Sequence, residues 1–541
     1  MASHVTPVSC SALPPGSSNG VRRTAGPKSF FLAAGTTNRV NLVLKNSQRF
    51  WGNLSNFRCN VASNGSTDNR FDQSTTNGEI SMSPYIWPDK KRPRVCILGG
   101  GFGGLYTALR LESLFWPDDR KPQVVLVDQS DRFVFKPMLY ELLTGEVDSW
   151  EIAPTFTELL KNTSVLFVKD RVKILRPCDH LHHGRTNKDT LNCAGTVDLE
   201  SGTSIEYDWL VLALGTEPKL DVVPGSAEYA IPFSTLEDAL RVDKELKRLE
   251  RGMSGNGSLP IGVAIVGCGY SGVELAATIS ERLQSNGKVQ AINVQTTICP
   301  SAPPGNREAA LKVLESRNIE LLLGYFVSCI KEVGGASDDG STIKQKKYIL
   351  ELQPAQRGLQ RQSLEVDLVL WTVGSTPLIP RLQPPDQPFA IPLNGRGLVE
   401  TEETLRVKGH SRTFAIGDSA ALRDLSGKLL PATAQVAFQQ ADFAGWNLWA
   451  AINDRPLLPF RFQNLGEMMV LGKSDAAVTP SFIEGFTLDG PIGHAARKFA
   501  YLLRLPTDEH RVKVGISWFT KTAIDSAASL QSSITNLLSG N

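Results

Sequence analysis

Two stretches of the chain show the same change from a short apolar run to apolar positions at helical spacing. Residues 95–98 and 263–266 are uninterrupted apolar runs, and glycines follow each of them within a few positions. Apolar residues then recur at the spacing of a helix over 105–114 and 274–283. A continuous apolar run suits a strand that is buried on both faces, as in a parallel sheet. The pattern therefore predicts a strand, a tight turn and a helix, twice in one polypeptide.

Each of these units is completed by a later apolar run, at 209–218 and at 367–377. Both later runs end in a glycine followed by a small hydroxyl residue. The chain therefore repeats a whole nucleotide-binding half, and not only its glycines. We predict an α/β fold with two Rossmann-like dinucleotide-binding domains, in which the second domain is inserted into a discontinuous first domain.

The turns carry the spacing G-x-G-x-x-G. Alone, this spacing is weak evidence for nucleotide binding, and it is stronger evidence with a strand before it and a helix after it. Glycines allow the tight turn and let the backbone approach a pyrophosphate, whose negative charge the helix N-terminus attracts. The alternative is a glycine-rich turn in an ordinary α/β unit, which two complete copies make much less favoured. The candidate residues are Gly99, Gly101, Gly104, Gly267, Gly269 and Gly272, with Gly215 and Gly374 ending the later apolar runs.

An acid ends the strand after the first glycine turn and is missing after the second. Asp128 stands where a carboxylate can accept both hydroxyls of an adenosine ribose, as FAD or NAD requires. In the second copy we expect Gln295 or Thr296 at this position. Without an acid to repel a 2′-phosphate, we predict that NADPH is accepted at least comparably with NADH. Arg307 is a candidate for positive charge nearby, or an ordinary arginine of a surface helix.

A third signature follows the short strand expected at 413–416, where the chain turns at Gly417 and Asp418. In flavoproteins with two nucleotide domains, such an Asp hydrogen-bonds the ribityl chain of the flavin, and the next helix points its positive end at the ring. The alternative is an ordinary turn at the end of a strand. Together the three signatures resemble the pyridine-nucleotide-dependent flavoprotein oxidoreductases over residues 94–448.

The helix expected after this turn indicates the electron acceptor. Residues 434–440 read A-Q-V-A-F-Q-Q and resemble the A-Q-x-A-x-Q-Q segment of the type II NAD(P)H:quinone oxidoreductases. The resemblance implies that Gln435, Gln439 and Gln440 border a quinone tunnel under the flavin. It also implies that Glu274, within a G-x-E segment, lies between the nicotinamide and flavin sites. The alternatives are a structural helix rich in Gln and Ala, and an acid that the helix N-terminus favours.

The same resemblance implies FAD as the cofactor, NADPH or NADH as the co-substrate and a membrane quinone as the acceptor, in a ping-pong relay. Glu274 and the three glutamines are then candidates for orientation and proton handling. The domains are predicted as a transit peptide and linker at 1–88, an FAD-binding domain at 89–258 and 390–455, an NAD(P)H-binding domain at 259–389, and a C-terminal membrane-anchoring or dimerisation region at 456–541.

The spacing of the cysteines argues against a disulfide reductase. The eight cysteines include no C-x-x-C or C-x4-C pair. A metal site is conceivable in the insertion at 178–193, which contains three histidines and two cysteines. Its spacing matches no closed zinc pattern, so an exposed hairpin is favoured there and no metal is predicted.

A quinone with an isoprenoid tail requires access to lipid. The net charge of +2 predicts no nucleic-acid partner, and no apolar span of the length of a transmembrane helix is present. Residues 491–505 instead show the pattern of an interfacial amphipathic helix, with Phe499 and Leu503 for acyl chains and with Arg497 and Lys498 for phosphate headgroups. A helix that covers the protein's own core or a homodimer interface is the alternative.

The N-terminal segment is rich in Ser, Thr, Asn and Gly and has no acidic residue before Asp68. This composition predicts an organelle transit peptide, for the chloroplast in preference to the mitochondrion, with dual targeting left open. A plastid favours plastoquinone or a phylloquinone precursor at a thylakoid or plastoglobule surface, a mitochondrion favours ubiquinone, and the nearest relatives expected are the plant type C enzymes. The rival interpretations are a signalling flavoprotein of the apoptosis-inducing-factor kind and a sulfide:quinone reductase, which needs cysteines near the flavin.

Overall fold

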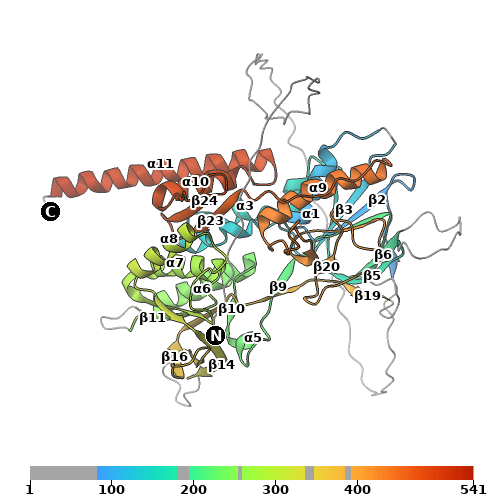
Figure 1. Cartoon of the computed structure of the whole chain (residues 1–541). Helices are drawn as coiled ribbons and strands as arrows, with labels where there is room; N and C mark the ends of the chain where they lie inside the picture. The colour runs from blue at the N-terminus through green and yellow to red at the C-terminus, as the bar shows by residue number, and fades with distance from the viewer. Residues whose placement is uncertain are drawn as a thin grey trace, which may run out of the picture. The chain divides into compact units, whose positions relative to one another are not determined.

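Two parallel sheets with the same connection pattern form the framework of the protein, shown as a computed structural model in Figure 1. The structure describes residues 82–117, 119–179, 194–253, 259–334, 346–383 and 391–539, with side chains of the last helix only as far as Ile524. All of them lie in one unit that begins at Gly78. The mixed α/β fold with parallel sheets that the sequence predicts is confirmed.

The first sheet has the strand order β21-β8-β2-β3-β4, with every pair parallel. Its central strands are apolar and buried along nearly their whole length, as strands covered on both faces must be. Helix α1 connects β2 to β3 and packs on both. The bounds are Arg94–Leu98 for β2, Phe102–Ser113 for α1, Gln123–Asp128 for β3, Leu166–Lys169 for β4, Trp209–Leu212 for β8 and Thr413–Ala415 for β21.

The second sheet repeats this arrangement in the order β10-β17-β11-β12-β13, again with every pair parallel. Helix α7 takes the place of α1, between β11 and β12. The predicted duplication is therefore present in three dimensions. The bounds are Ile231–Pro232 for β10, Leu236–Gly252 for α6, Ile261–Val266 for β11, Tyr270–Leu283 for α7, Gly287–Asn293 for β12, Pro304–Ser316 for α8, Glu320–Leu323 for β13 and Leu368–Trp371 for β17.

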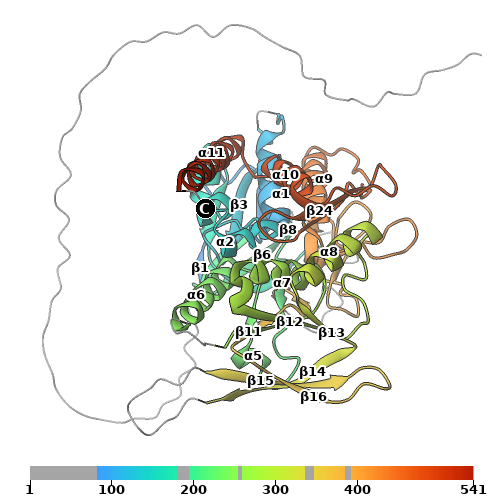
Figure 2. The same ribbon diagram turned by 90° about the vertical axis from the view of Figure 1, so that its left-hand side faces the viewer.

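Each parallel sheet is accompanied by three antiparallel strands, and in the first case the short strands β1 (Ser83–Pro84) and β19 (Arg381–Leu382) extend them in parallel. The strands β5, β6 and β7 (Val172–Pro177, Gly195–Leu199 and Thr203–Tyr207) lie beside the first sheet. The strands β14, β15 and β16 (Tyr325–Val333, Lys347–Pro354 and Gln362–Val366) lie on the face of the second sheet opposite α7, as Figure 2 shows. The conceivable metal site at 178–193 lies outside the described residues except for Cys178 and Asp179, and the described residues hold no cluster of three metal-ligating side chains.

Two short antiparallel strands carry the chain between the sheets. β9 (Thr216–Pro218) leaves the first sheet and pairs with β18 (Ser375–Pro377), which leaves the second. Because β10 at Ile231 already belongs to the second sheet, the chain changes sheets near Pro218, earlier than the predicted boundary at residue 259. We call the β9 and β18 pair the crossover strands.

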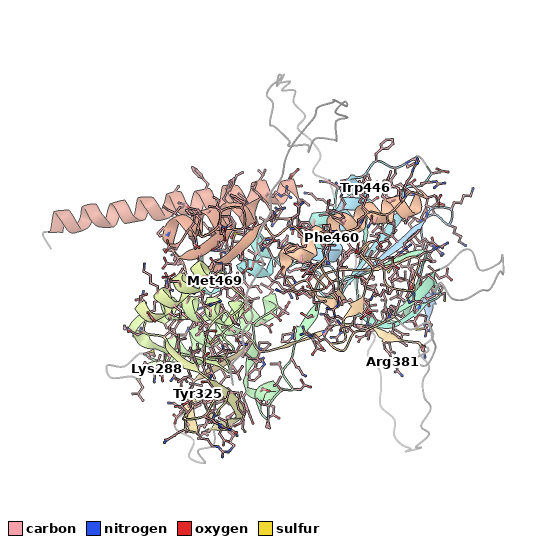
Figure 3. The ribbon with its side chains drawn as sticks, in the orientation of Figure 1. Lys288, Tyr325, Arg381, Trp446, Phe460 and Met469 are labelled. Atoms are coloured by element: carbon pink, nitrogen blue, oxygen red, sulfur yellow. The ribbon has the colours of Figure 1, made fainter. Side chains whose placement is uncertain are left out.

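The C-terminal part packs against both sheets' helices. Helix α9 (Ala434–Ile452) lies along α1, and β23 (Gly466–Val470) contacts α7 (Figure 1). Met469 of β23 is labelled in Figure 3 above the second sheet. The chain continues through β24 (Ala476–Pro480), α10 (Gly490–Leu502) and the long α11 (Asp508–Ser539). Among the described residues, no helix combines the length and apolar character that crossing a bilayer demands.

Candidate functional site

The first glycine turn is closed at its outer glycines and open at its middle one. Gly99 has a φ of +99°, and a Cβ there would lie 2.2 Å from the carbonyl oxygen of Ala213. A Cβ on Gly104 would lie 1.7 Å from the Gly99 carbonyl oxygen, so only a glycine lets α1 pack on the turn. Around Gly101, the N-cap of α1, no atom lies within 4 Å of that position. This opening at a helix N-terminus fits a diphosphate.

The second glycine turn repeats this geometry. Gly267 has a φ of +103°, and a Cβ on Gly272 would lie 1.8 Å from the Gly267 carbonyl oxygen. Gly269, the N-cap of α7, again has no atom within 4 Å of its Cβ position. Both turns therefore fit a dinucleotide, which supports the roles predicted for these glycines.

Asp128 ends β3 directly beside the first glycine turn. Its carboxylate accepts hydrogen bonds from the backbone N–H groups of Gly100 at 2.6 Å and Ser130 at 2.8 Å. Burial raises the pKa of Asp128, although these two N–H groups and the Lys136 ammonium oppose the rise. The carboxylate stands where an adenosine ribose would lie against the turn.

The strand register identifies the residue equivalent to Asp128 in the second sheet. Leu98 is paired with Val127, and Val266 with Ile292, so the residue after Ile292 corresponds to Asp128. That residue is Asn293, whose Oδ1 accepts the Cys268 N–H at 3.4 Å, as Asp128 accepts the Gly100 N–H. The assignment of this position to Gln295 or Thr296 is therefore wrong by two or three residues. Asn293 is also uncharged, so the acceptance of NADPH stays a prediction on the same grounds.

The Arg307 side chain hydrogen-bonds the backbone of the loop before α8 and is not directed at a nucleotide. Its guanidinium donates hydrogen bonds to the carbonyl oxygens of Cys299, Pro300 and Ala302 at 3.4, 3.1 and 3.0 Å. The interpretation of Arg307 as an ordinary arginine of a helix is the better one.

The variant Asn293→Asp is expected to raise the KM for NADPH by roughly tenfold or more and to change the KM for NADH little, since a carboxylate repels the 2′-phosphate. Steady-state kinetics with both nucleotides measure this. Gln295→Asp is the matched control, because the exposed Gln295 lies beyond the end of β12. A larger effect from Gln295→Asp than from Asn293→Asp would restore the original assignment.

Gly417 and Asp418 form a short turn that α9 holds in place. Gly417 has a φ of +72°, and its N–H donates to Oε1 of the buried Gln440 at 2.7 Å. Burial raises the pKa of Asp418, against the opposing charge of Lys136. The structure thus brings Gln440 to the turn that is expected to meet the ribityl chain.

The crossover strands lie between two cavities. One cavity, of about 340 Å³, contains Asp418 and Gln440, and the other, of about 270 Å³, contains Ser271 and Thr372 from the second nucleotide half. Both are lined by Thr216 and Ser375, which follow the left-handed Gly215 and Gly374. The two predicted nucleotide sites therefore meet at the strands that follow these glycines.

Gln435 and Gln439 both hold the segment before β23. Gln435 donates to the Gly466 carbonyl at 3.0 Å and accepts the Leu465 N–H at 3.1 Å. Gln439 donates to the Gln463 carbonyl at 2.8 Å and accepts the N–H of the same residue at 3.0 Å. These side chains therefore shape the chain near α9, and their contact with a quinone remains a prediction.

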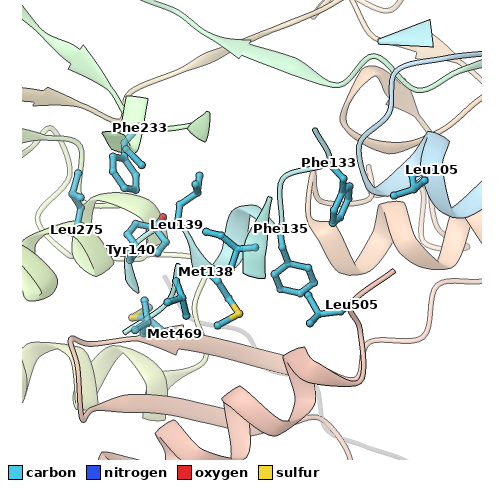
Figure 4. Close-up of a cluster of buried hydrophobic side chains, with 14 of the residues drawn as sticks. Leu105, Phe133, Phe135, Met138, Leu139, Tyr140, Phe233, Leu275, Met469 and Leu505 are labelled. Atoms are coloured by element: carbon cyan, nitrogen blue, oxygen red, sulfur yellow. The ribbon is translucent and has the colours of Figure 1, made fainter. Parts of the chain in front are cut away.

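Glu274 lies buried on α7, and its Oε1 accepts the backbone N–H of Val470 at 3.0 Å. Tyr140 also hydrogen-bonds its carboxyl group, and Figure 4 shows that ring beside Met469 and Leu275. Burial raises the pKa of Glu274 to about 7. Strand β23 thus begins at Gly466, which Gln435 hydrogen-bonds, and ends at Val470, which hydrogen-bonds Glu274. No motif in the sequence indicates this connection.

A buried ion pair beside Glu274 is the main feature that the sequence reasoning missed. Arg497 of α10 and Glu141 are both completely buried and form an ion pair, and the guanidinium lies 5.2 Å from the centre of the Tyr501 ring. The charge of Arg497 lowers the pKa of Glu274. The assignment of Arg497 to lipid headgroups is therefore wrong. In the sequence, the four-residue spacing puts Arg497 on the same helix face as the small Gly493, which is the only signal that this face packs against the protein. The structure shows that both residues are buried.

The described cysteines form no disulfide. Cys268 and Cys299 lie near the second glycine turn, where the Cys299 N–H donates to the Cys268 carbonyl at 2.8 Å. Burial raises the pKa of both thiols to about 12, which disfavours thiolate chemistry.

Comparison with known proteins identifies the class to which this fold and site belong. The model of a family described as pyridine nucleotide-disulphide oxidoreductase matches residues 93–441, and the chain belongs to this family. The solved structure of NDH2 from Plasmodium falciparum in complex with NADH covers 80% of this chain and 98% of its own, with a TM-score of 0.62 and 17% identity. At that identity, the likeness shows the fold alone.

Two curated relatives show which kind of enzyme within this family the chain resembles. The alternative NAD(P)H-ubiquinone oxidoreductase C1, chloroplastic/mitochondrial, of Arabidopsis thaliana is 65% identical over 91% of this chain and 93% of its own length. The demethylphylloquinone reductase NdbB of Synechocystis is 43% identical over 80% of this chain and 96% of its own. They confirm the resemblance to type II NAD(P)H:quinone oxidoreductases, and with it the expected enzyme class and the use of FAD and NAD(P)H.

Proposed function

We propose that this FAD-dependent NAD(P)H:quinone oxidoreductase works while it rests on one face of an organelle membrane, from which it draws its quinone. The observation that carries the proposal is the set of exposed apolar side chains on the two C-terminal helices, several of whose charged side chains have partners inside the protein. The geometry of the site supplies the rest.

The residues of the two glycine turns fit the two nucleotides. Gly101 opens the site for FAD, with Asp128 and Asp418 placed for its ribose and ribityl hydroxyls, and Gly269 opens the site for NAD(P)H beside the neutral Asn293. FAD, when bound, supplies the ring that accepts a hydride and yields two electrons. The role that we propose for the chain itself is to position both nucleotides across the crossover strands.

Glu274 is the group we propose for proton handling. Its pKa of about 7 lets it hold or release a proton at neutral pH. The Val470 N–H and Tyr140 fix the orientation of its carboxyl group. Quinone reduction consumes protons, and a buried carboxyl group with this pKa can deliver them.

The quinone end of the site is proposed beyond Glu274, where α9 and α10 approach it. Gln435 and Gln439 hold the segment before β23, and Gln440 holds the turn at Asp418. Among the described residues, Nε and Nη1 of Arg497 have no hydrogen-bond partner although they are buried. A quinone carbonyl is an acceptor that suits such donors.

Helix α11 turns two polar side chains of its middle part toward the protein. Lys521 and Ser517 reach the completely buried carboxylate of Glu151, at 3.0 and 2.6 Å. The outward side instead carries Ile516, which is 64% exposed, and Phe519, which is 78% exposed. The first turns of α11 expose Asp508 and Lys513 and bury Val514, as in a soluble helix. The exposed large apolar side chains that follow favour an apolar environment outside the protein.

Helix α10 has a similar arrangement. Arg497 points inward to Glu141, and Lys498 reaches Glu146 at 3.0 Å. Ile492 and Phe499 are exposed by 71% and 64%. The acyl chains of a lipid surface fit these side chains, while a homodimer contact is the alternative that the next test separates.

Replacing Ile516 and Phe519 together by Glu is expected to abolish binding to anionic liposomes, because two carboxylates would have to enter the acyl region. Oxidation of NAD(P)H by a water-soluble quinone is expected to stay within about twofold, since both side chains point away from the site. Co-sedimentation measures the first and a spectrophotometric assay the second. Leu240→Glu, on the exposed side of α6, is the matched control.

Sedimentation velocity decides between lipid and a second copy of the chain. Loss of a dimer without loss of liposome binding would contradict the lipid proposal. Truncation before α10 is unsuitable, because it removes the partner of Glu141. A deletion must begin after Lys521, because Ser517 and Lys521 of α11 are partners of the buried Glu151.

We also propose a chloroplast location, at the thylakoid or plastoglobule surface, with plastoquinone or a phylloquinone precursor as the acceptor and with ubiquinone if the protein also enters mitochondria. The acid-poor leader and the names of the two curated relatives support this. Stopped-flow reduction of the holoprotein by NADPH, followed by mixing with quinone analogues, tests the function. A reduced protein that persists in the presence of every quinone would favour a signalling flavoprotein.

A further inference from the structure

A group of charged side chains lies between α10 and the segment that contains the short helix α2 (Glu141–Thr144). Nε2 of His494 lies 3.2 Å from Oε1 of Glu146, and the Lys498 ammonium donates to the same oxygen at 3.0 Å. His494 and Lys498 share this side of α10 because they are four residues apart. The exposed fraction of the side chain is 23% for Lys498, 12% for His494 and 7% for Glu146. It falls to 1% at Glu141, so the group extends from the protein surface to the buried ion pair.

Two buried polar atoms of this group lack a partner among the residues that the structure describes. They are Nδ1 of His494 and Oε2 of Glu141, whose other carboxylate oxygen is paired with Arg497. His494 lies one turn before Arg497 on α10, so both atoms belong to the same interface. Buried polar atoms bond to ordered water where no protein group reaches them. The imidazole thus has one nitrogen on the carboxylate of Glu146 and the other inside the protein, where water can connect it to Glu141.

Quinone reduction by this enzyme must take up one proton from solvent in each turnover. NAD(P)H supplies two electrons and one proton with its hydride, whereas conversion of a quinone to the quinol takes two electrons and two protons. Glu274 is buried and has to regain a proton after it gives one to the quinone. Helix α2 packs against α7, which carries Glu274, and Tyr140, the N-cap of α2, hydrogen-bonds its carboxyl group. The charged group on α10 therefore begins at the surface and ends beside Glu274.

We propose that His494 and Glu146 are the entry through which Glu274 regains its proton from solvent. A neutral imidazole takes up a proton at Nε2, beside the Glu146 carboxylate, and releases another from Nδ1 toward the interior. Bound water and the unpaired oxygen of Glu141 carry this proton on to the Glu274 carboxylate. The inference rests on the role proposed for Glu274 and adds the route by which its proton arrives. It does not involve the lipid surface.

The variant His494→Gln keeps a hydrogen-bond donor for Glu146 but cannot relay a proton. Reoxidation of the reduced holoprotein by a soluble quinone, followed by stopped flow, is expected to slow by roughly tenfold or more. Reduction of its FAD by NADPH should be unchanged, because hydride transfer needs no proton from this route, and this step also controls for folding. In a second variant, His494→Ala, the removed ring leaves room for free imidazole, which should restore much of the reoxidation rate.

Lys498→Gln is the matched control, because it removes the other partner of Glu146 and leaves the imidazole in place. Its reoxidation rate should stay close to that of wild type and should not respond to imidazole. An equal loss in Lys498→Gln, an unchanged rate in His494→Gln, or a loss in His494→Ala that imidazole does not restore would each overturn the proposal.

Glu274→Gln, measured in the same stopped-flow assay, separates this route from the function on which it rests. Slow reoxidation in Glu274→Gln together with a wild-type rate in His494→Gln would remove only the route. A wild-type rate in Glu274→Gln would remove the role of Glu274 itself, and with it any need for a route.

Discussion

The variant Arg497→Met is expected to lower the free energy of unfolding by about 3–5 kcal/mol, because it leaves the completely buried carboxylate of Glu141 without its partner. Glu141→Leu should have a cost of similar size, since the guanidinium is then the uncompensated charge. Chemical denaturation of the holoproteins, with FAD in excess, measures both.

The double variant Arg497→Met with Glu141→Leu distinguishes the net contribution of the ion pair from the cost of leaving one charge unpaired. Replacing a buried ion pair by apolar side chains is often neutral for stability, so the double variant should be clearly more stable than either single one. Turnover should fall in Arg497→Met, because the charge of Arg497 lowers the pKa of Glu274, and should be partly restored in the double variant, because Glu141 raises that pKa. Additive losses of stability in the double variant would contradict the buried pair, and full turnover in Arg497→Met would contradict the link to Glu274.

The strands, turns and helices of the two nucleotide halves could be predicted from the sequence because each is encoded locally. Gly104 and Gly272 sit where a Cβ would meet the backbone of the preceding turn, and the shortest of these approaches is to the glycine five residues earlier. The return strands were equally visible, since a strand buried on both faces must be apolar throughout.

The residue at which a strand ends is harder to predict from the sequence than the strand itself. Apolar and polar residues alternate after Ile292, so the sequence suggested a strand reaching Gln295, whereas β12 ends at Asn293. The hydrogen bond from the Cys268 N–H to Asn293 fixes the equivalence, and it joins residues that are distant in the sequence. Pairing of this kind cannot be derived from periodicity.

The sequence shows that α10 is amphipathic, but it misleads about which environment the basic residues meet. A helical pattern shows which residues share a side and does not show which side faces the protein. Glu141 decides this for Arg497, and Glu151 decides it for Lys521 on α11. The apolar sides face outward as predicted for a lipid contact, while these basic residues have structural partners inside.

Glu274→Gln is expected to lower quinone-linked turnover by roughly a hundredfold at neutral pH, the usual size of a positioned acid or base. With a pKa of about 7 in the folded protein, the carboxyl group is protonated below that pH and loses its proton above it. Wild-type turnover should therefore change across pH 7, whereas the variant should be flat in this range. The pH profile of kcat, measured with saturating NADPH and a soluble quinone, tests this.

Stability gives the same group a second readout. The pKa of Glu274 is raised from an ordinary 4.5 to about 7, so its protonated form is favoured in the folded state. Its contribution to stability is present below about pH 4.5 and is lost as the pH rises through about 7. Wild-type Tm should fall more than that of Glu274→Gln over this range. Glu308→Gln, at an exposed position on α8, is the matched control and should follow wild type. Parallel pH dependence of Tm in wild type and Glu274→Gln, with an unchanged kcat profile, would remove Glu274 from proton handling and leave it a purely structural acceptor for Val470.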